Sequence, residues 1–170
     1  HQQPYFGARG LVAVKHANAV ANVRMMGEML SLNSSKPALV WAPHYHDLCL
    51  VCFILGPIYY GYESTLMSPM DFLLKPARWL QAMSRYKVAN TACPNFGYEY
   101  AVRRVTPEQC EGLDLSNWIV AGSGGEPVLS STMSAFKKKF GPSGFKPQAF
   151  APTFGTAESV LFVTASHYLF

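Results

Sequence analysis

Two histidines and a carboxylate stand together in the segment Pro43-His44-Tyr45-His46-Asp47. In an extended segment the pattern His-x-His places both imidazoles on one side, and Asp47 could supply a third ligand to a metal ion. A second interpretation needs no metal: Asp47 caps a helix that begins at Leu48, and a neighbouring carboxylate positions His46 against a substrate in a cleft. The first interpretation predicts a metal hydrolase built on His44, His46 and Asp47, and the second predicts a substrate-binding cleft.

Glycines gather in a second segment, Gly122-Ser123-Gly124-Gly125-Glu126-Pro127, between an apolar run and an expected helix. Glycines at such a place let backbone N–H groups approach a nucleotide or a phosphate closely. The segment matches neither GxGxxG nor a Walker loop, so a plain tight turn is the alternative.

An aromatic residue and a carboxylate flank a third segment, Phe154-Gly155-Thr156-Ala157-Glu158. The ring could stack on a nucleotide base while Glu158 reaches a phosphate-bound Mg²⁺, since that ion prefers oxygen ligands. The simpler alternative is that Glu158 stabilises the first turn of a helix through the helix dipole. Cys49 and Cys52 form a CxxC pattern among Leu, Val and Phe, which predicts small buried apolar side chains rather than redox or zinc chemistry.

Short apolar runs that alternate with helical patterns must position these residues. This alternation predicts an α/β fold with a mostly parallel sheet flanked by helices. Ligands of such sheets bind beyond the carboxyl ends of the strands, where the loops 43–47, 93–96, 122–127 and 154–158 fall. The expected strands are 11–14, 38–42, 64–68, 88–93, 118–121 and 148–154. The expected helices are 20–30, 48–60 after Asp47, 76–86 and 94–104. Three further helices are expected: one from Pro107, one capped by Ser130 or Ser131 and ending at Phe140, and one near Thr156.

Composition excludes several classes of protein. The 170 residues are 49% hydrophobic and only 14% charged, which excludes intrinsic disorder, and a net charge of +4 is too small for a nucleic-acid surface. The longest apolar run, 48–55, is too short for a transmembrane segment, and no signal-peptide pattern is visible. Four scattered cysteines favour a reduced protein, so we expect a cytoplasmic location.

Longer segments accompany these motifs. In order they are HANAVANVRMM (16–26), PHYHDL (43–48), LMSPMDFLLKPARWLQAMSRY (66–86), PNFGYEYAVRRVTPEQCEGLDLSNW (94–118), GGEPV (124–128) and FGTAE (154–158). Together they resemble the adenylate-forming (AMP-binding) superfamily, and within it most closely the fatty acyl-AMP ligases. The resemblance runs from about Gly10 to Val163, so we expect a partial adenylation domain over 10–170 preceded by an unmatched segment, 1–9.

The resemblance implies a reaction in which a fatty acid carboxylate attacks the α-phosphate of ATP, giving acyl-AMP and pyrophosphate, with Mg²⁺ on the phosphates. A carrier thiol, such as that of an acyl carrier protein, would then accept the acyl group. His46 matches the histidine beside the reacting carboxylate, and Glu158 matches the metal-binding carboxylate. The nucleotide-binding positions are Gly124, Gly125, Glu126, Pro127, Phe154, Gly155 and Thr156, and the acyl-pocket positions are Asn95, Phe96 and Tyr98.

The sequence also departs from the family pattern. A Ser/Thr/Gly-rich phosphate loop should lie just before Leu11, but QQPYFGARG (2–10) stands there. The chain ends before the ribose-binding aspartate motif and the C-terminal lid of the family. We therefore expect an incomplete ligase that needs the remainder of an adenylation domain. The alternative is a non-catalytic remnant that acts as an acyl or nucleotide binding module, or as an interaction module.

Overall fold

Six short strands form one sheet in the computed structural model, which describes residues 12–166. The first five strands run parallel, and the last is antiparallel to its neighbour. This arrangement confirms the predicted α/β class with a mostly parallel sheet. In spatial order the strands are β2 (Ser64–Leu66), β1 (Ala38–Val40), β3 (Asn90–Cys93), β4 (Val120–Ser123), β5 (Phe150–Gly155) and β6 (Phe162–Ala165).

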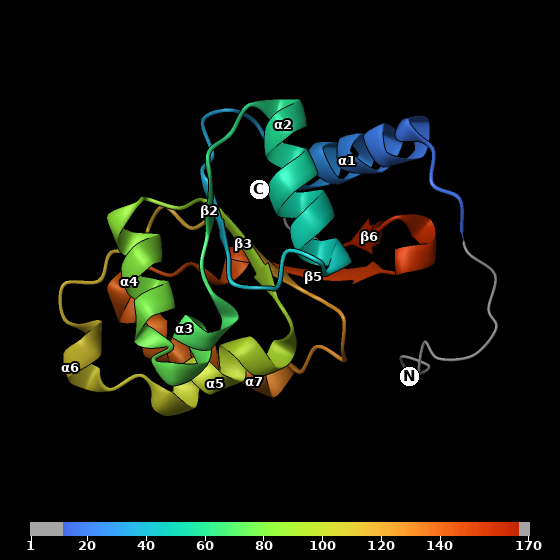
Figure 1. Cartoon of the computed structure of the whole chain (residues 1–170). Coiled ribbons are helices and arrows are strands. Elements are labelled where there is room, and N and C mark those ends of the chain that lie inside the picture. The colour runs from blue at the N-terminus through green and yellow to red at the C-terminus, as the bar shows by residue number, and fades with distance from the viewer. Residues whose placement is uncertain (1–11, 167–170) are drawn as a thin grey trace.

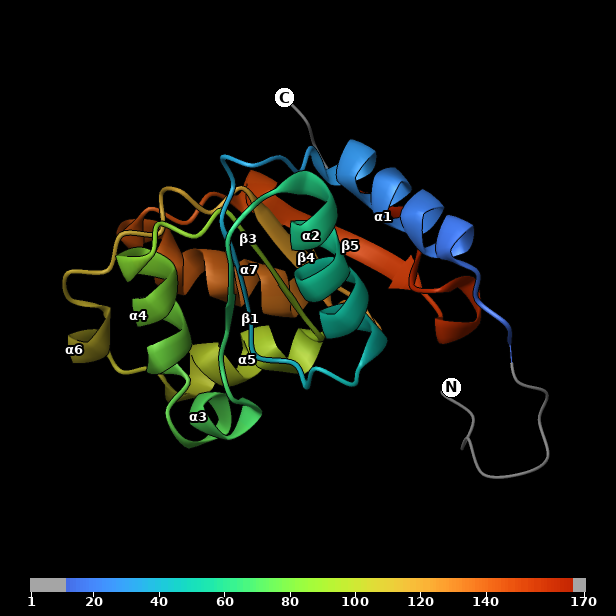
Figure 2. The ribbon, with the colours of Figure 1, turned by 45° about the horizontal axis from the view of Figure 1, so that its top comes forward.

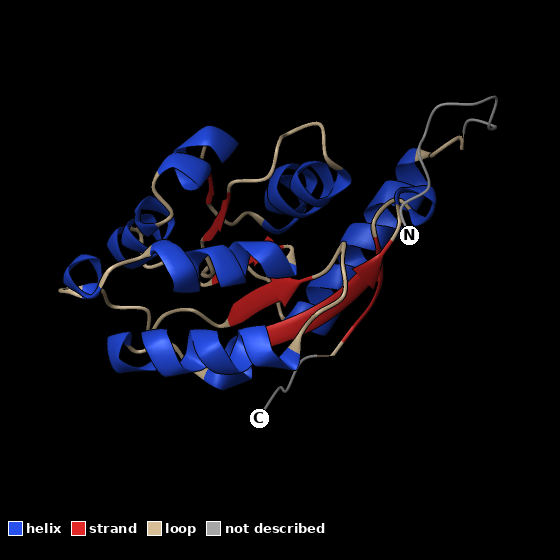
Figure 3. Ribbon diagram, turned by 90° about the horizontal axis from the view of Figure 1, so that it is seen from below, coloured by secondary structure: helices blue, strands red, loops and turns tan. Residues whose placement is uncertain are grey.

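Helices cover both faces of the sheet (Figures 1 and 3). Neighbouring residues of β1 point to opposite faces, so Ala38 and Val40 pack in one core cluster and Leu39 packs in the other. The first cluster lies under α1 (His16–Leu30), η1 (Leu48–Leu55) and α2 (Gly56–Tyr60). The second lies under α3 (Pro69–Leu74), α4 (Ala77–Arg85), α5 (Asn95–Arg104) and α7 (Ser130–Phe140), and the short α6 (Pro107–Cys110) follows α5.

Aromatic side chains make up the centre of the second cluster. Trp79, Trp118 and Tyr98 are at most 1% exposed, and the rings of Trp79 and Trp118 meet edge to face with centroids 5.4 Å apart. Each such pair contributes about 0.5–1.5 kcal/mol beyond the area that it buries. One face of the sheet therefore packs against a buried aromatic core.

Most predicted elements are confirmed with ends within two residues, although α1 begins four residues before the expected 20, and three expectations are wrong. No strand forms over 12–14, because the described part of the chain offers that segment no partner strand; Leu11 lies outside the described residues. The segment 48–60 is helical as expected, and its first eight residues wind as a π-helix. The N-cap of α7 is Leu129, not Ser130 or Ser131. The helix expected near Thr156 is a single 3₁₀ turn, η4 (Ala157–Ser159), before β6.

None of the helices in the described residues has the length and apolar character needed to cross a membrane.

Candidate functional site

Four loops meet at the carboxyl edge of the sheet because β1, β3, β4 and β5 are parallel. The segments that follow these strands carry the sequence-predicted residues, from His46 after β1 to Glu158 after β5. Figure 2 shows the long strand β5 leading to the turn that carries Glu158, near the start of α1. The structure thus brings the predicted motifs to one side of the molecule, as the α/β class requires.

The loops after β3 and β4 are joined by two hydrogen bonds. The backbone N–H of Phe96, in the first turn of α5, donates to Oε1 of Glu126 at 2.6 Å. In return, the N–H of Leu129, the N-cap residue of α7, donates to Oδ1 of Asn95 at 3.0 Å. Each helix start is therefore capped by a side chain from the other loop, which supplies acceptors for N–H groups that helices leave unpaired.

The three residues expected to line an acyl pocket have different environments in the structure. Phe96 is 41% exposed at the start of α5 and lies edge-on to Trp41, with ring centroids 5.7 Å apart. Asn95 is 5% exposed and is engaged with α7. Tyr98 is 1% exposed in the aromatic core, where its hydroxyl donates to the carbonyl oxygen of Gly122 at 2.8 Å. Only Phe96 offers a ring surface to a ligand here, while Asn95 and Tyr98 hold the adjoining backbone.

The glycine turn after β4 packs closely against β5. A Cβ on Gly124 would lie 2.7 Å from the carbonyl oxygen of Thr153, so only glycine fits there. Gly125 has φ +79°, a left-handed conformation that glycine adopts without strain. The hydroxyl oxygen of Ser123, just before this turn, is buried without a hydrogen-bond partner in the described part of the chain. The turn therefore exposes backbone at the sheet edge, beside an unpaired polar atom.

His46 and Asp47 form a hydrogen-bonded pair after β1. Nδ1 of His46 lies 2.7 Å from Oδ1 of Asp47, and the Leu48 N–H also donates to that carboxylate at 2.7 Å. This hydrogen bond raises the pKa of His46 and lowers the pKa of Asp47, against the opposite effect of partial burial. Because Nδ1 is used within the pair, Nε2 is the imidazole nitrogen left for a substrate. Asp47 also caps η1 through Leu48, as the sequence predicts.

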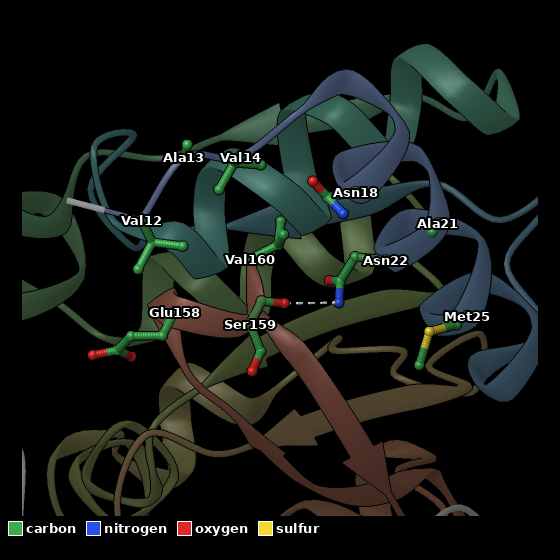
Figure 4. A pocket seen from close by; sticks show the side chains of 10 residues that line it. All are labelled: Val12, Ala13, Val14, Asn18, Ala21, Asn22, Met25, Glu158, Ser159 and Val160. Atoms are coloured by element: carbon green, nitrogen blue, oxygen red, sulfur yellow. Dashed lines mark hydrogen bonds between the residues drawn. The ribbon is translucent and has the colours of Figure 1, made fainter. Parts of the chain in front are cut away.

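The turn between β5 and β6 carries Phe154 and Glu158. Phe154 is 60% exposed near the end of β5, and Glu158 is exposed on η4. An open pocket of about 310 Å³ lies between this turn and α1 (Figure 4). Its lining includes Glu158, Ser159 and Val160 from the turn and Asn18 and Asn22 from α1.

Sequence reasoning missed Asn22 and a second pocket. The second pocket, of about 370 Å³, lies between the loop after β1, with His44 and Tyr45, and the segment 66–69 that follows β2. Segment 66–69 follows a parallel strand at the same edge, so the rule for ligand sites in such sheets could have identified it. No local signal marks Asn22, which is 6% exposed on the buried side of α1.

The structure gives no support to the metal hydrolase interpretation. Within residues 12–166, no three His, Cys, Asp or Glu side chains are grouped so that they could hold a metal ion. A single exposed carboxylate such as Glu158 nevertheless suits Mg²⁺ on a nucleotide, because that ion takes one or two carboxylates and completes its coordination with phosphates and water. Burial raises the pKa of both the Cys49 and Cys52 thiols, in agreement with apolar rather than redox behaviour.

Known proteins share the sequence of this chain over most of its length. The sequence profile described as "AMP-binding enzyme" matches residues 8–168. The chain is 40% identical over 157 residues to the medium-chain-fatty-acid–[acyl-carrier-protein] ligase JamA of Moorena producens, covering 92% of this chain and 26% of that protein. It is 36% identical over 159 residues to the long-chain-fatty-acid–AMP ligase FadD26 of Mycobacterium marinum, covering 91% of this chain and 27% of that protein.

A solved structure shares the fold of this chain. The fatty acyl-adenylate ligase from L. pneumophila, determined in complex with acyl adenylate and pyrophosphate, superposes with a TM-score of 0.89 at 40% identity. The match covers 92% of this chain and 28% of that one. The chain thus spans about a quarter of the length of the relatives that it matches.

Proposed function

This chain belongs to the AMP-binding enzyme family, and from that premise we propose that it is part of an ATP-dependent ligase that activates a fatty acid as acyl-AMP. A fatty acid carboxylate oxygen would form a bond to the α-phosphorus of ATP, and the bond to pyrophosphate would break. The whole reaction is a proposal for this chain, because it spans only about a quarter of its relatives. We expect it to bind the acyl-adenylate but to need the remainder of an adenylation domain for turnover.

The observation that carries this proposal is the placement of the glycine turn beside the exposed ring. Strands β4 and β5 are paired, with Ser123 opposite Pro152, so the turn 124–127 and Phe154 lie at the ends of adjacent strands. We assign adenine binding to Gly124, Gly125, Glu126 and Pro127, with Gly155 and Thr156 beyond the ring. Stacking on Phe154 suits this role because a ring that is 60% exposed offers its face to a base.

Other residues have roles on the acyl and phosphate sides. We assign to His46 a hydrogen bond from Nε2 to the reacting carboxylate, with Asp47 fixing the other ring nitrogen at 2.7 Å. Phe96 would contact the acyl chain directly, while Asn95 and Tyr98 fix the wall of that pocket. Glu158 would hold Mg²⁺, which when bound neutralises charge on the phosphates.

Partners and location follow from the same assignment. The substrates would be a fatty acid and ATP, and an acyl carrier protein is the proposed acceptor, as the name of the Moorena relative suggests. Residues 10–170 would form one partial adenylation domain, with 1–9 outside it; the segment 1–9 lies outside the described residues. Four free cysteines support a reducing compartment, and we propose the cytoplasm.

Calorimetric titration with a non-hydrolysable long-chain acyl-adenylate analogue tests the proposal without requiring turnover. Phe154→Ala should weaken binding by about 1–3 kcal/mol, the range for loss of one base-stacking ring. Glu126→Ala should also weaken binding, because it releases the N–H of Phe96 beside the acyl pocket. Ile119→Ala and Glu111→Ala, which alter exposed residues away from the loops that carry the site, are the matched controls and should bind normally.

Two outcomes would overturn parts of the proposal. A folded wild-type chain that does not bind the analogue would favour the remnant alternative, an interaction module that keeps only the family fold. Rapid pyrophosphate release from ATP and a long-chain fatty acid would instead show that this chain alone is a complete ligase.

A further inference from the structure

One polar side chain lies buried on the inner side of α1. Asn22 is 6% exposed, and its carboxamide makes three hydrogen bonds to residues about 140 positions later in the chain. Nδ2 donates to the carbonyl oxygen of Phe162 at 2.7 Å, and Oδ1 accepts from the N–H of Phe162 at 2.9 Å. The side chain therefore pairs with the backbone of β6 as a neighbouring strand would.

A third bond from Asn22 extends into the turn that carries Glu158. Nδ2 also donates to the carbonyl oxygen of Ser159 at 3.1 Å, and Figure 4 shows this bond at the side of the pocket. Ser159 follows Glu158 directly on η4. One carboxamide thus ties α1 both to the first residue of β6 and to the turn before it.

The turn itself is strained and needs such support. Val160 has φ +73° and ψ −58°, a positive-φ conformation of the γ-turn type that is costly for a β-branched residue. Such conformations persist only where the surrounding structure fixes them. The hydrogen bond from the Thr156 N–H to the Leu161 carbonyl oxygen, 2.9 Å, closes the base of the turn. Asn22 holds the turn from α1 by donating to the Ser159 carbonyl oxygen.

We propose that Asn22 is a positioning residue for Glu158: by fixing the η4 turn, it holds the carboxylate where a nucleotide-bound divalent cation needs it. This inference rests on the proposed function. The Glu158 side chain is exposed, so its location depends on the backbone that carries it. The open pocket of about 310 Å³ between that turn and α1 leaves the turn room to shift toward α1 if Asn22 releases it.

A purely structural role for Asn22 would have a different consequence. If the residue only fastened α1 to the sheet, its loss would lower stability without changing metal affinity in the folded chain. When a group that orients a metal ligand without touching the metal is removed, metal affinity typically falls by about 10-fold to 100-fold. The affinity for a nucleotide-bound cation therefore distinguishes a residue that positions Glu158 from one that only holds α1 on the sheet.

The test uses the whole chain with Mn²⁺–ATP as the probe. Asn22→Asp removes both donors and places a carboxylate against two carbonyl oxygens, and Asn22→Ala removes all three bonds without adding a charge. Asn18→Asp is the matched control: it adds the same charge to the same pocket one helical turn earlier, and it keeps the acceptor oxygen that Asn18 offers to the Lys15 N–H. Mn²⁺ binding is measured by electron paramagnetic resonance, and exchange of the Ser159, Val160 and Phe162 amides by NMR.

We expect both Asn22 variants to weaken Mn²⁺–ATP binding by about 10-fold or more and to accelerate exchange of the turn amides, while Asn18→Asp changes neither. Thermal unfolding identifies a variant that fails to fold. The inference also requires that the Phe162 amide exchanges slowly in the wild-type chain, because that N–H donates to Asn22. Wild-type affinity in a folded Asn22→Ala chain would overturn the inference alone. A wild-type chain that binds no Mn²⁺–ATP would overturn the proposed function and this inference together.

Discussion

Substituting Asn95 should destabilise the chain through α7 rather than through its own helix. The Asn95 carboxamide is 5% exposed and supplies the acceptor for the N–H of Leu129 at the start of α7. In Asn95→Ala this partly buried N–H loses its partner, and an unsatisfied group of this kind costs about 1–3 kcal/mol. Loss of a helix cap by itself costs about 0.5–2 kcal/mol. The two figures describe one lost bond, so the expected decrease in the free energy of unfolding is about 2 kcal/mol.

Urea denaturation followed by tryptophan fluorescence measures this decrease, and for a chain of this size it corresponds to a fall in Tm of about 4–8 °C. Glu126→Gln is the matched control, because the amide oxygen of glutamine can still accept from the N–H of Phe96. Its effect should stay within about 0.5 kcal/mol.

A double-mutant cycle tests whether the two caps act together. Glu126 accepts from an N–H at the start of α5, and Asn95 accepts from an N–H at the start of α7. Loss of either side chain therefore loosens the contact between the two helix starts on which the other hydrogen bond depends. Asn95→Ala combined with Glu126→Ala should show an interaction energy of about 0.5 kcal/mol or more. An Asn95→Ala chain with unchanged unfolding free energy, or strict additivity of the two substitutions, would refute the reasoning.

Two further predictions concern the loop after β1 and the base of the β5–β6 turn. The pKa of His46 is raised above its ordinary value of 6.5, and the pKa of Asp47 is lowered below its ordinary value of 3.8. Their pairing therefore stabilises the fold fully between pH 3.8 and pH 6.5. The stabilisation is lost as pH rises through the folded pKa of His46 or falls through the folded pKa of Asp47. Asp47→Asn should therefore lower the His46 pKa in an NMR titration, and an unchanged value would contradict the pairing. Gly155→Ala should destabilise the fold by about 1–3 kcal/mol, because its Cβ would overlap the Leu161 carbonyl oxygen. Gly141→Ala, which meets no atom within 4 Å, should be neutral in the same thermal unfolding assay.

Local patterns predicted much of this fold because its strands are short apolar runs with clear boundaries. The helix α5 after Pro94 and the helix α6 after Thr106 have sequence signals at their first residues, and the structure confirms both. The run 48–55 is apolar throughout, so its periodicity indicates a buried helix but cannot distinguish a π-helix from an α-helix.

The missed features depend on tertiary contacts that local patterns do not show, except α3 (Pro69–Leu74), which the expected helices left out although Ser68 and Pro69 are local signals of a helix start. Asn22 looks like a polar residue on a helix surface until β6 is placed against it, and that contact joins residues about 140 positions apart. Near Thr156, an early carboxylate in Glu158 suggests the first turn of a helix. The structure instead reverses the chain there, because Gly155 has no side chain to block the Leu161 carbonyl oxygen. Which loop residues touch a ligand likewise depends on tertiary placement, as the burial of Tyr98 illustrates.

The strand order also sets how the chain can fold while it is being synthesised. With the order β2-β1-β3-β4-β5-β6, every strand after the first pairs with a strand that the ribosome has already made. Within residues 12–166 no strand has to wait for a later one, so this part of the sheet can grow from β1 in the order of translation, at about 5–20 residues per second. During that growth the open edge moves from β3 to β4 to β5, and each newly made strand covers the edge before it. Among the strands of residues 12–166, the backbone left unpaired during this growth, which favours aggregation, is that of the last strand made and of the short strand β2 on the other side.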